Sequence, residues 1–168
     1  TWLFQPGVWS DHPDYLYAGN QFKKSDIQLS PIPDVAWDSS HFTRFPLWLM
    51  SLSDAYNDGE TNKSYYEVLK KGLEKQFYNK VLVKPTADFS GYRTNNYMDG
   101  RNGLYRWGYA TQGLNNGYGP YELSGTLILG WWTFLDSNRI RKLYVDIAKS
   151  FPLSQDVLNV YVGPNTTR

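Results

Sequence analysis

The chain has 168 residues, a formal net charge of +1 and no cysteine, and 17% of its residues are aromatic. This length fits about one domain with its own core, and the near-neutral charge provides no basic field that would collect nucleic acid. The absence of cysteine excludes disulfides, thiol nucleophiles and cysteine-ligated metals.

Residues 1–35 form the first segment, in which proline or glycine recurs every few positions. Such spacing is typical of irregular backbone. Aromatic residues are nevertheless spread through the segment, at Trp2, Phe4, Trp9, Tyr15, Tyr17 and Phe22. We therefore expect an ordered segment that wraps around a neighbouring surface and docks its rings there, rather than a solvated linker.

Residues 36–83 are expected to form a first αα-hairpin. Residues 36–56 are apolar on nearly every side of a helix, which is typical of a buried helix, and Asp38 is a capping residue at its start. Pro46 should either begin the helix proper near Phe45 or kink it. The next helix should open with a capping box and be amphipathic. Its capping pair is Ser64 and Glu67, its inner residues are Tyr66, Leu69, Leu73 and Phe77, and its outer residues are Lys70, Lys71, Glu74 and Lys75.

Residues 84–119 connect the two predicted hairpins and are longer than an ordinary loop. Loops longer than about 12–15 residues are usually functional or disordered. The segment is rich in Tyr, Trp, Asn and Gly. These residues provide stacking faces, hydrogen-bonding groups and left-handed turns, and the Asn-Gly pair in "NNGYG" favours a short hairpin. We expect an ordered functional loop here.

Residues 120–152 repeat the plan of the first hairpin. Pro120 fits the first helical position, and residues 121–135 are again apolar nearly all round. An amphipathic helix over residues 139–151 should follow and end at Pro152. Its apolar stripe holds Ile140, Leu143, Tyr144, Ile147 and Phe151. With residues 153–168 as a tail, the prediction is one all-α domain over 1–168, complete or part of a longer chain, in which each hairpin pairs an inner buried helix with an outer amphipathic one.

Three stretches carry a resemblance to a known architecture: "VAWDSSHFTR", "NNYMDGRNGLYRWGY" and "GYGPYELSG". An inner helix preceded by a long loop rich in Gly, Asn and Tyr resembles the (α/α) toroid glycoside hydrolases and polysaccharide lyases. The likeness covers about residues 34–151. It implies stacked αα-hairpins in which the loops at one end of the inner helices line a sugar cleft.

Glycoside hydrolysis is the leading function that this resemblance implies. Inversion needs two carboxyl groups about 6.5–9.5 Å apart, one as general acid and one as general base. Asp38, Asp99 and Glu122 lie at loop–helix junctions and are the candidate acids. Each also has a structural explanation, as an N-cap, a turn residue and a first-turn acid respectively. The candidate sugar contacts are Tyr92, Arg93, Tyr97, Arg101, Trp107 and Tyr118.

A polysaccharide lyase is the alternative enzyme. It would use a His or Tyr base near an Arg or Asn that neutralises a uronate, and His41 or Tyr97 could be that base. Arg93, Asn96 and Arg101 could be the neutralising groups, although a lone His beside a buried helix is also a common packing residue. A glycan-binding module without catalysis is the third hypothesis.

Other chemistries find little support in the sequence. The chain has two His and no Cys, so we expect no metal and no other cofactor. Ser39 and Ser40 are too close in sequence to His41 for a catalytic triad, and no phosphate-binding loop is present. The longest apolar run, residues 127–135, is shorter than the about 20 residues that span a bilayer. We expect a secreted or periplasmic protein whose partners are a carbohydrate and either the rest of a larger chain or another subunit.

Overall fold

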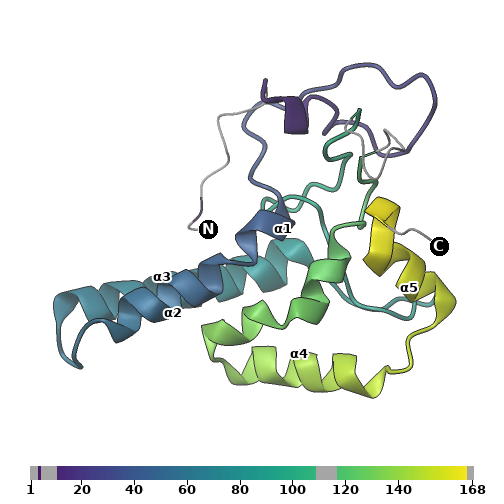
Figure 1. Cartoon of the computed structure of the whole chain (residues 1–168). Coiled ribbons are helices and arrows are strands. Elements are labelled where there is room, and N and C mark those ends of the chain that lie inside the picture. The colour runs from purple at the N-terminus through teal and green to yellow at the C-terminus, as the bar shows by residue number, and fades with distance from the viewer. Residues whose placement is uncertain (1–3, 5–10, 109–116, 166–168) are drawn as a thin grey trace.

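The computed structural model describes Phe4, residues 11–108 and residues 117–165. Within these residues the fold is mostly helical, with one short antiparallel strand pair (Figure 1). The elements in chain order are η1 (Pro13–Tyr15), α1 (Ser39–Phe42), α2 (Phe45–Asp54), α3 (Thr61–Gln76), η2 (Phe77–Val81), β1 (Leu82–Val83), β2 (Arg93–Thr94), η3 (Ser124–Leu129), η4 (Trp131–Leu135), α4 (Asn138–Lys149), α5 (Gln155–Val162) and η5 (Gly163–Asn165).

The helix expected over residues 36–56 is divided into α1 and α2. Asp38 caps α1, and Pro46 lies in the first turn of α2, where its missing N–H costs no hydrogen bond. The expectation that this helix is buried all round is wrong for α2. Leu49 is buried, but Trp48 and Leu52 are 50% and 44% exposed.

The helix α3 lies antiparallel beside α2 and completes the first hairpin, which extends to the left in Figure 1. Leu73 is buried as predicted, and so is Phe77, the first residue of η2. The predicted capping box is wrong, because α3 begins at Thr61 and Ser64 lies inside it. Glu67 instead accepts hydrogen bonds from Ser53 Oγ (2.7 Å) and Lys70 Nζ (3.0 Å). Lys70, expected outside, is therefore buried against α2.

The predicted α-helix over residues 121–135 is not formed. Two 3₁₀-helices, η3 and η4, replace it, and Pro120 lies in a turn before them. The backbone is left-handed at Tyr121 (φ 67°) and at Gly130 (φ 71°). Because a left-handed residue breaks a right-handed helix, the apolar pattern folds as two short helices. Leu127, Trp132 and Leu135 are buried, whereas Ile128 and Leu129 are exposed.

The amphipathic helix α4 is confirmed, with Ile140, Leu143 and Ile147 buried along one stripe. Ser137 caps it by accepting a hydrogen bond from the amide of Ile140 (3.2 Å). Phe151 lies beyond its last residue and is 54% exposed, so its assignment to the stripe is wrong. A further helix, α5, forms within the segment predicted to be a tail.

Two apolar clusters hold the fold together. The larger one joins α2, α3, η4 and α4, and it contains the stacked pair of Phe77 and Trp132, whose ring centroids are 4.1 Å apart. The smaller cluster joins the N-terminal segment to the long loop and holds Tyr15, Ala18, Val35, Tyr97, Tyr105 and Leu123. Docking of the N-terminal segment is thus confirmed for Tyr15, whereas Phe22 is 71% exposed.

The long loop is ordered over its described residues. Its β2 pairs with β1, and an isolated antiparallel bridge joins Tyr105 to Tyr118. This bridge agrees with a hairpin at "NNGYG", although Asn115 and Asn116 lie outside the described residues. No helix in the described part of the chain is both long and apolar enough to cross a bilayer.

Candidate functional site

Asp38 stands where the long loop meets α1. Its backbone forms an isolated antiparallel bridge with Tyr97, and two flanking hydrogen bonds join Ser39 N to Asn96 O (2.7 Å) and Met98 N to Trp37 O (2.9 Å). The carboxylate of Asp38 accepts the amide N–H of His41 (3.0 Å), which is the expected N-cap bond. The loop and the helix start therefore hold each other in one position.

The side chain of His41 turns back onto the same carboxylate. Its Nδ1 lies 3.0 Å and 2.9 Å from the two oxygens of Asp38. An ionised carboxylate can only accept hydrogen bonds, so Nδ1 carries the proton and the neutral ring has its lone pair on Nε2. Within the described part of the chain, Nε2 has no hydrogen-bond partner.

The two groups shift each other's pKa. The hydrogen bond to Asp38 raises the pKa of His41 above its ordinary value, although partial burial and the nearby positive charges of Arg106 and Arg44 oppose the shift. Burial alone would raise the pKa of Asp38, but hydrogen bonds from His41 and Ser40 outweigh it and lower that pKa. Asp38 is thus an ionised partner that makes His41 a stronger base.

A second acid lies beside this pair. Asp14, which is buried, accepts hydrogen bonds from the hydroxyl of Tyr105 (3.2 Å) and from Nε of Arg106 (2.9 Å). The same Tyr105 hydroxyl is 3.4 Å from Nδ1 of His41. Burial raises the pKa of Tyr105, and the nearby charge of Asp38 adds to the shift, so this phenol stays neutral.

These groups line one cavity of about 300 Å³. Its walls come from η1, from α1 and its N-terminal flank, and from the long loop. The lining residues are His12, Asp14, Tyr15, Trp37, Asp38, His41, Tyr105 and Arg106. The cavity therefore offers two imidazoles, a guanidinium and the half-buried ring of Trp37 to a ligand, beside walls formed by the buried Tyr15 and Tyr105. This is the mixture of apolar walls and few polar groups typical of binding sites.

The backbone beside the cavity is strained at one position. Arg106 has φ 53°, a left-handed conformation that costs a residue with a side chain about 1–2 kcal/mol. Its N–H is held by the carbonyl of Asp14 (2.9 Å). On its other side, a side chain at Gly117 would place its Cβ 2.3 Å from the carbonyl oxygen of Arg106, so only glycine fits there. Strain of this kind often accompanies functional sites.

The other two predicted acids bind backbone groups elsewhere. Asp99 accepts the amides of Ala36 (3.1 Å) and Arg101 (2.8 Å). Glu122 accepts the amide of Gly119 (2.7 Å) and pairs with Lys23. Neither is among the described residues that line the cavity of His41.

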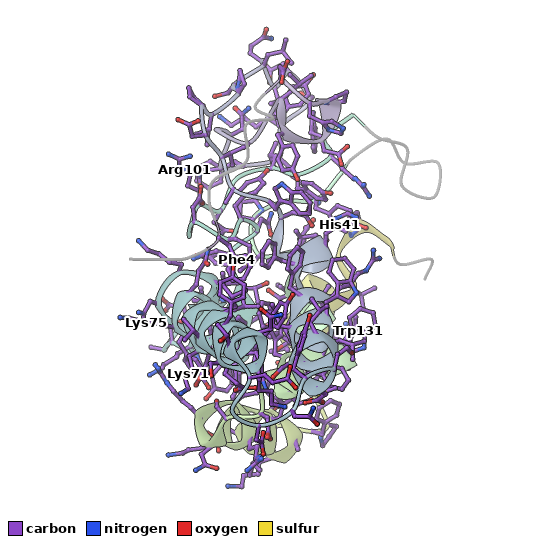
Figure 2. All side chains as sticks on the ribbon, turned by 90° about the vertical axis from the view of Figure 1, so that its left-hand side faces the viewer. Phe4, His41, Lys71, Lys75, Arg101 and Trp131 are labelled. Atoms are coloured by element: carbon purple, nitrogen blue, oxygen red, sulfur yellow. The ribbon has the colours of Figure 1, made fainter. Side chains whose placement is uncertain are left out.

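The predicted sugar contacts are dispersed in the structure. Tyr97 is fully buried and donates its hydroxyl to the carbonyl of Leu104, so it cannot reach a ligand. Arg93 lies between the rings of Phe89 and Tyr121, at 4.4 Å and 4.3 Å from their centroids. Arg101 is exposed beside Asp99, on the opposite side of the molecule from His41 in the view of Figure 2.

The remaining three contacts are half-buried. Trp107 directly follows Arg106 in the loop, and Tyr118 pairs with Tyr105 across the bridge. Tyr92 lines a different cavity, described below. Of the ten predicted site residues, the structure places Asp38 and His41 together in one cavity lining.

Sequence reasoning did not select six of the residues that line this cavity: His12, Asp14, Tyr15, Trp37, Tyr105 and Arg106. Asp14 and Arg106 are 92 positions apart, and neither belongs to a motif. The one available signal was the "LYRW" run, whose neighbouring Tyr and Arg lie in the loop that was predicted to be functional.

The arrangement can remove a proton from a bound ligand. A His whose Nδ1–H is held by a buried carboxylate presents a basic Nε2, which is the general-base geometry of many enzymes. The described residues contain no group of three or more metal-ligating side chains.

The pairing of His41 with Asp38 should make stability depend on pH. Because the folded pKa of His41 is raised, the stabilisation is fully present below the unfolded value of 6.5 and is lost as pH rises through the folded value. We expect the unfolding free energy of wild type minus that of His41→Gln to be larger at about pH 5.5 than at about pH 9. Urea denaturation at both pH values measures this difference, and a difference that does not change with pH would contradict the pairing.

In comparisons with known proteins, no family model, no curated protein and no solved structure matches the sequence.

Proposed function

We propose that the protein is a carbohydrate-active enzyme that cleaves an acidic polysaccharide by β-elimination, with His41 as the general base. The observation that supports this most strongly is the bond of His41 Nδ1 to both oxygens of the buried Asp38. It leaves a basic Nε2 on a ring that lines a cavity with Arg106. The half-buried ring of Trp37 provides a face in the same lining for a sugar ring.

The proposed step begins at a uronate unit, where Nε2 of His41 takes the proton on the carbon next to the carboxylate. The electron pair of that C–H bond forms a carbon–carbon double bond, and the glycosidic C–O bond to the leaving sugar breaks. The proton on His41 then passes to the leaving oxygen. Arg106 lines the cavity and pairs with Asp14 through its Nε (2.9 Å), and its guanidinium is the cation that stabilises the negative charge developing on the substrate carboxylate.

The contacts of the acids favour elimination over hydrolysis. A glycosidase needs one carboxyl group that is protonated at working pH, which an apolar setting would provide. Asp38 has its pKa lowered, and Asp99 and Glu122 accept backbone amides as structural groups do. Asp14, the other acid in the cavity, is paired with Arg106.

The two reactions are separated by their products. We expect incubation with uronate-containing polysaccharides to generate an unsaturated uronate, which absorbs in the ultraviolet, and to generate none of it from neutral polysaccharides. A rise in reducing ends without that absorbance would support hydrolysis instead. Binding to the polysaccharide without either product would support a glycan-binding module.

The variant Glu122→Gln is the matched control for the carboxylate mechanism. Glutamine keeps a side-chain oxygen that can accept the amide of Gly119 and removes the acid. We expect the elimination rate to stay within about two-fold of wild type, because Glu122 makes its contacts outside the cavity. A fall in the elimination rate of about a hundred-fold would show that Glu122 takes part in catalysis, because general acid–base catalysis contributes about that much.

The architecture and location remain part of this proposal. The α2–α3 hairpin has the two packed α-helices of one toroid unit, whereas 3₁₀-helices replace the inner α-helix of the second unit. A polysaccharide substrate implies secretion or a periplasmic location.

A further inference from the structure

A second cavity of about 280 Å³ lies between α4 and the segment that follows α3. It shares no lining residue with the cavity of His41. Its lining consists of Tyr78, Leu82, Lys84, Tyr92, Arg139, Lys142, Leu143 and Asp146. Three cations and one carboxylate give this lining a formal charge of +2.

Within the described residues, Lys84, Lys142 and Arg139 form no ion pair, whereas the one carboxylate, Asp146, pairs with Lys149 (3.8 Å). Arg139 lies in the first turn of α4, where the helix dipole favours acids and disfavours cations, and Lys142 lies in the turn that follows. A cation at a position that the dipole disfavours, with no acid paired to it in the described part of the chain, commonly marks a functional position.

One of these cations is held in place. The guanidinium of Arg139 lies 3.8 Å from the centroid of the Tyr78 ring, and the Tyr78 hydroxyl donates to the backbone carbonyl of Arg139 (2.6 Å). The backbone of Tyr92 is fixed by the hydroxyl of Tyr161 (2.6 Å). An oriented guanidinium recognises planar or tetrahedral oxyanions well, and Tyr92 adds a ring face and a hydroxyl to the same lining.

We propose that this cavity is a second binding site, which takes an anionic sugar unit of a glycan: a carboxylate or sulfate on Lys84, Arg139 and Lys142, with the ring against Tyr92. The site itself is inferred from these charges and contacts. Only its assignment to the same glycan that reaches His41 rests on the proposed function. Two such sites would let one long acidic chain engage the protein at both cavities, which increases its effective affinity.

The test is a calorimetric titration with a uronate hexasaccharide and with a neutral hexasaccharide of equal length, at low salt. We expect the double variant Lys84→Gln/Lys142→Gln to weaken binding of the uronate by about ten-fold or more, because each lost charged contact is a strong one. The charge-matched control is Lys71→Gln/Lys75→Gln, two exposed lysines that point away from the body of the fold in Figure 2. It should weaken binding by less than about two-fold, because exposed charges at a distance are screened.

Equal losses in the two double variants would overturn the proposal, because they would show general charge attraction and no defined site. Equal binding of the neutral sugar would overturn it too. Inorganic sulfate serves as a competitor: if the hexasaccharide binds no more tightly than sulfate, the cavity takes a free anion and the assignment to a glycan is wrong.

The outcome is separable from that of the proposed reaction. His41→Gln should bind the uronate hexasaccharide through the second cavity even though it is inactive. If wild type forms no unsaturated product but Lys84→Gln/Lys142→Gln still weakens binding, the reaction is wrong and the anion site stands.

Discussion

Replacing His41 with Gln should reduce β-elimination of a uronate polysaccharide by about 10²–10⁴-fold, the range that a positioned general base contributes. The glutamine amide can still donate a hydrogen bond to the buried carboxylate of Asp38, which leaves that charge satisfied. It has no basic nitrogen to accept a proton. The loss should therefore fall on kcat, with far-ultraviolet circular dichroism unchanged, and ultraviolet absorbance of the product measures the rate.

The matched control is His12→Gln, which changes the only other histidine of the chain in the same cavity lining. His12 Nδ1 accepts the amide of Asp14 (3.2 Å), and the carboxylate nearest to it, that of Asp14, is 3.8 Å away. The contact of His41 Nδ1 with Asp38 is shorter, at 2.9 Å, and it is the one in which the ring donates to a buried carboxylate, so replacing His12 should cost far less. A larger loss in His12→Gln than in His41→Gln would assign the base to His12.

Replacing Trp132 with Ala should have the largest effect on stability, about 3–5 kcal/mol of unfolding free energy. The side chain is fully buried at the centre of the larger core cluster, stacked on Phe77 and surrounded by residues of α2, α3 and α4. Removing it leaves a cavity that the surrounding helices can fill only in part. Urea denaturation followed by circular dichroism measures the change.

Two further variants show whether burial is the cause. Trp48→Ala makes the same chemical change on the exposed face of α2 and should cost about 1 kcal/mol or less. Trp132→Phe keeps an aromatic ring and removes an indole N–H that has no partner among the described residues, so it should cost less than half as much as Trp132→Ala. Equal costs for Trp48→Ala and Trp132→Ala would contradict this account of the core.

The helices whose sequence carries a clear amphipathic period were predictable. In α4, Ile140, Leu143 and Ile147 recur at helical spacing and are buried. In α3, Leu73 and the following Phe77 are buried for the same reason. These features depend on contacts between residues three and four positions apart, which a single sequence contains.

The segments that are apolar all round were not predictable in detail. The same pattern folds as an α-helix in α2 and as 3₁₀-helices in η3 and η4, because Tyr121 and Gly130 adopt left-handed backbone. Such a pattern does not say which side faces the core. Only packing against α3 and α4 left Trp48 exposed and buried Trp132.

In the candidate site, too, local contacts were predictable from the sequence and long-range contacts were not. The sequence by itself determined that Asp38 caps a helix and accepts the backbone amide of His41, because an N-cap side chain meets the amide of the residue three positions later at any helix start. It could not place Asp14, Tyr105 and Arg106 beside them, since 91 positions separate Asp14 from Tyr105. Tertiary structure alone decided that contact, when the N-terminal segment docked Tyr15 against Tyr97 and Tyr105 and brought Asp14 to the loop. The physical reason is that the hydrophobic effect drives this docking. Its free energy depends on how much apolar area is buried and not on direction, so the order of residues along the chain does not show which rings will meet.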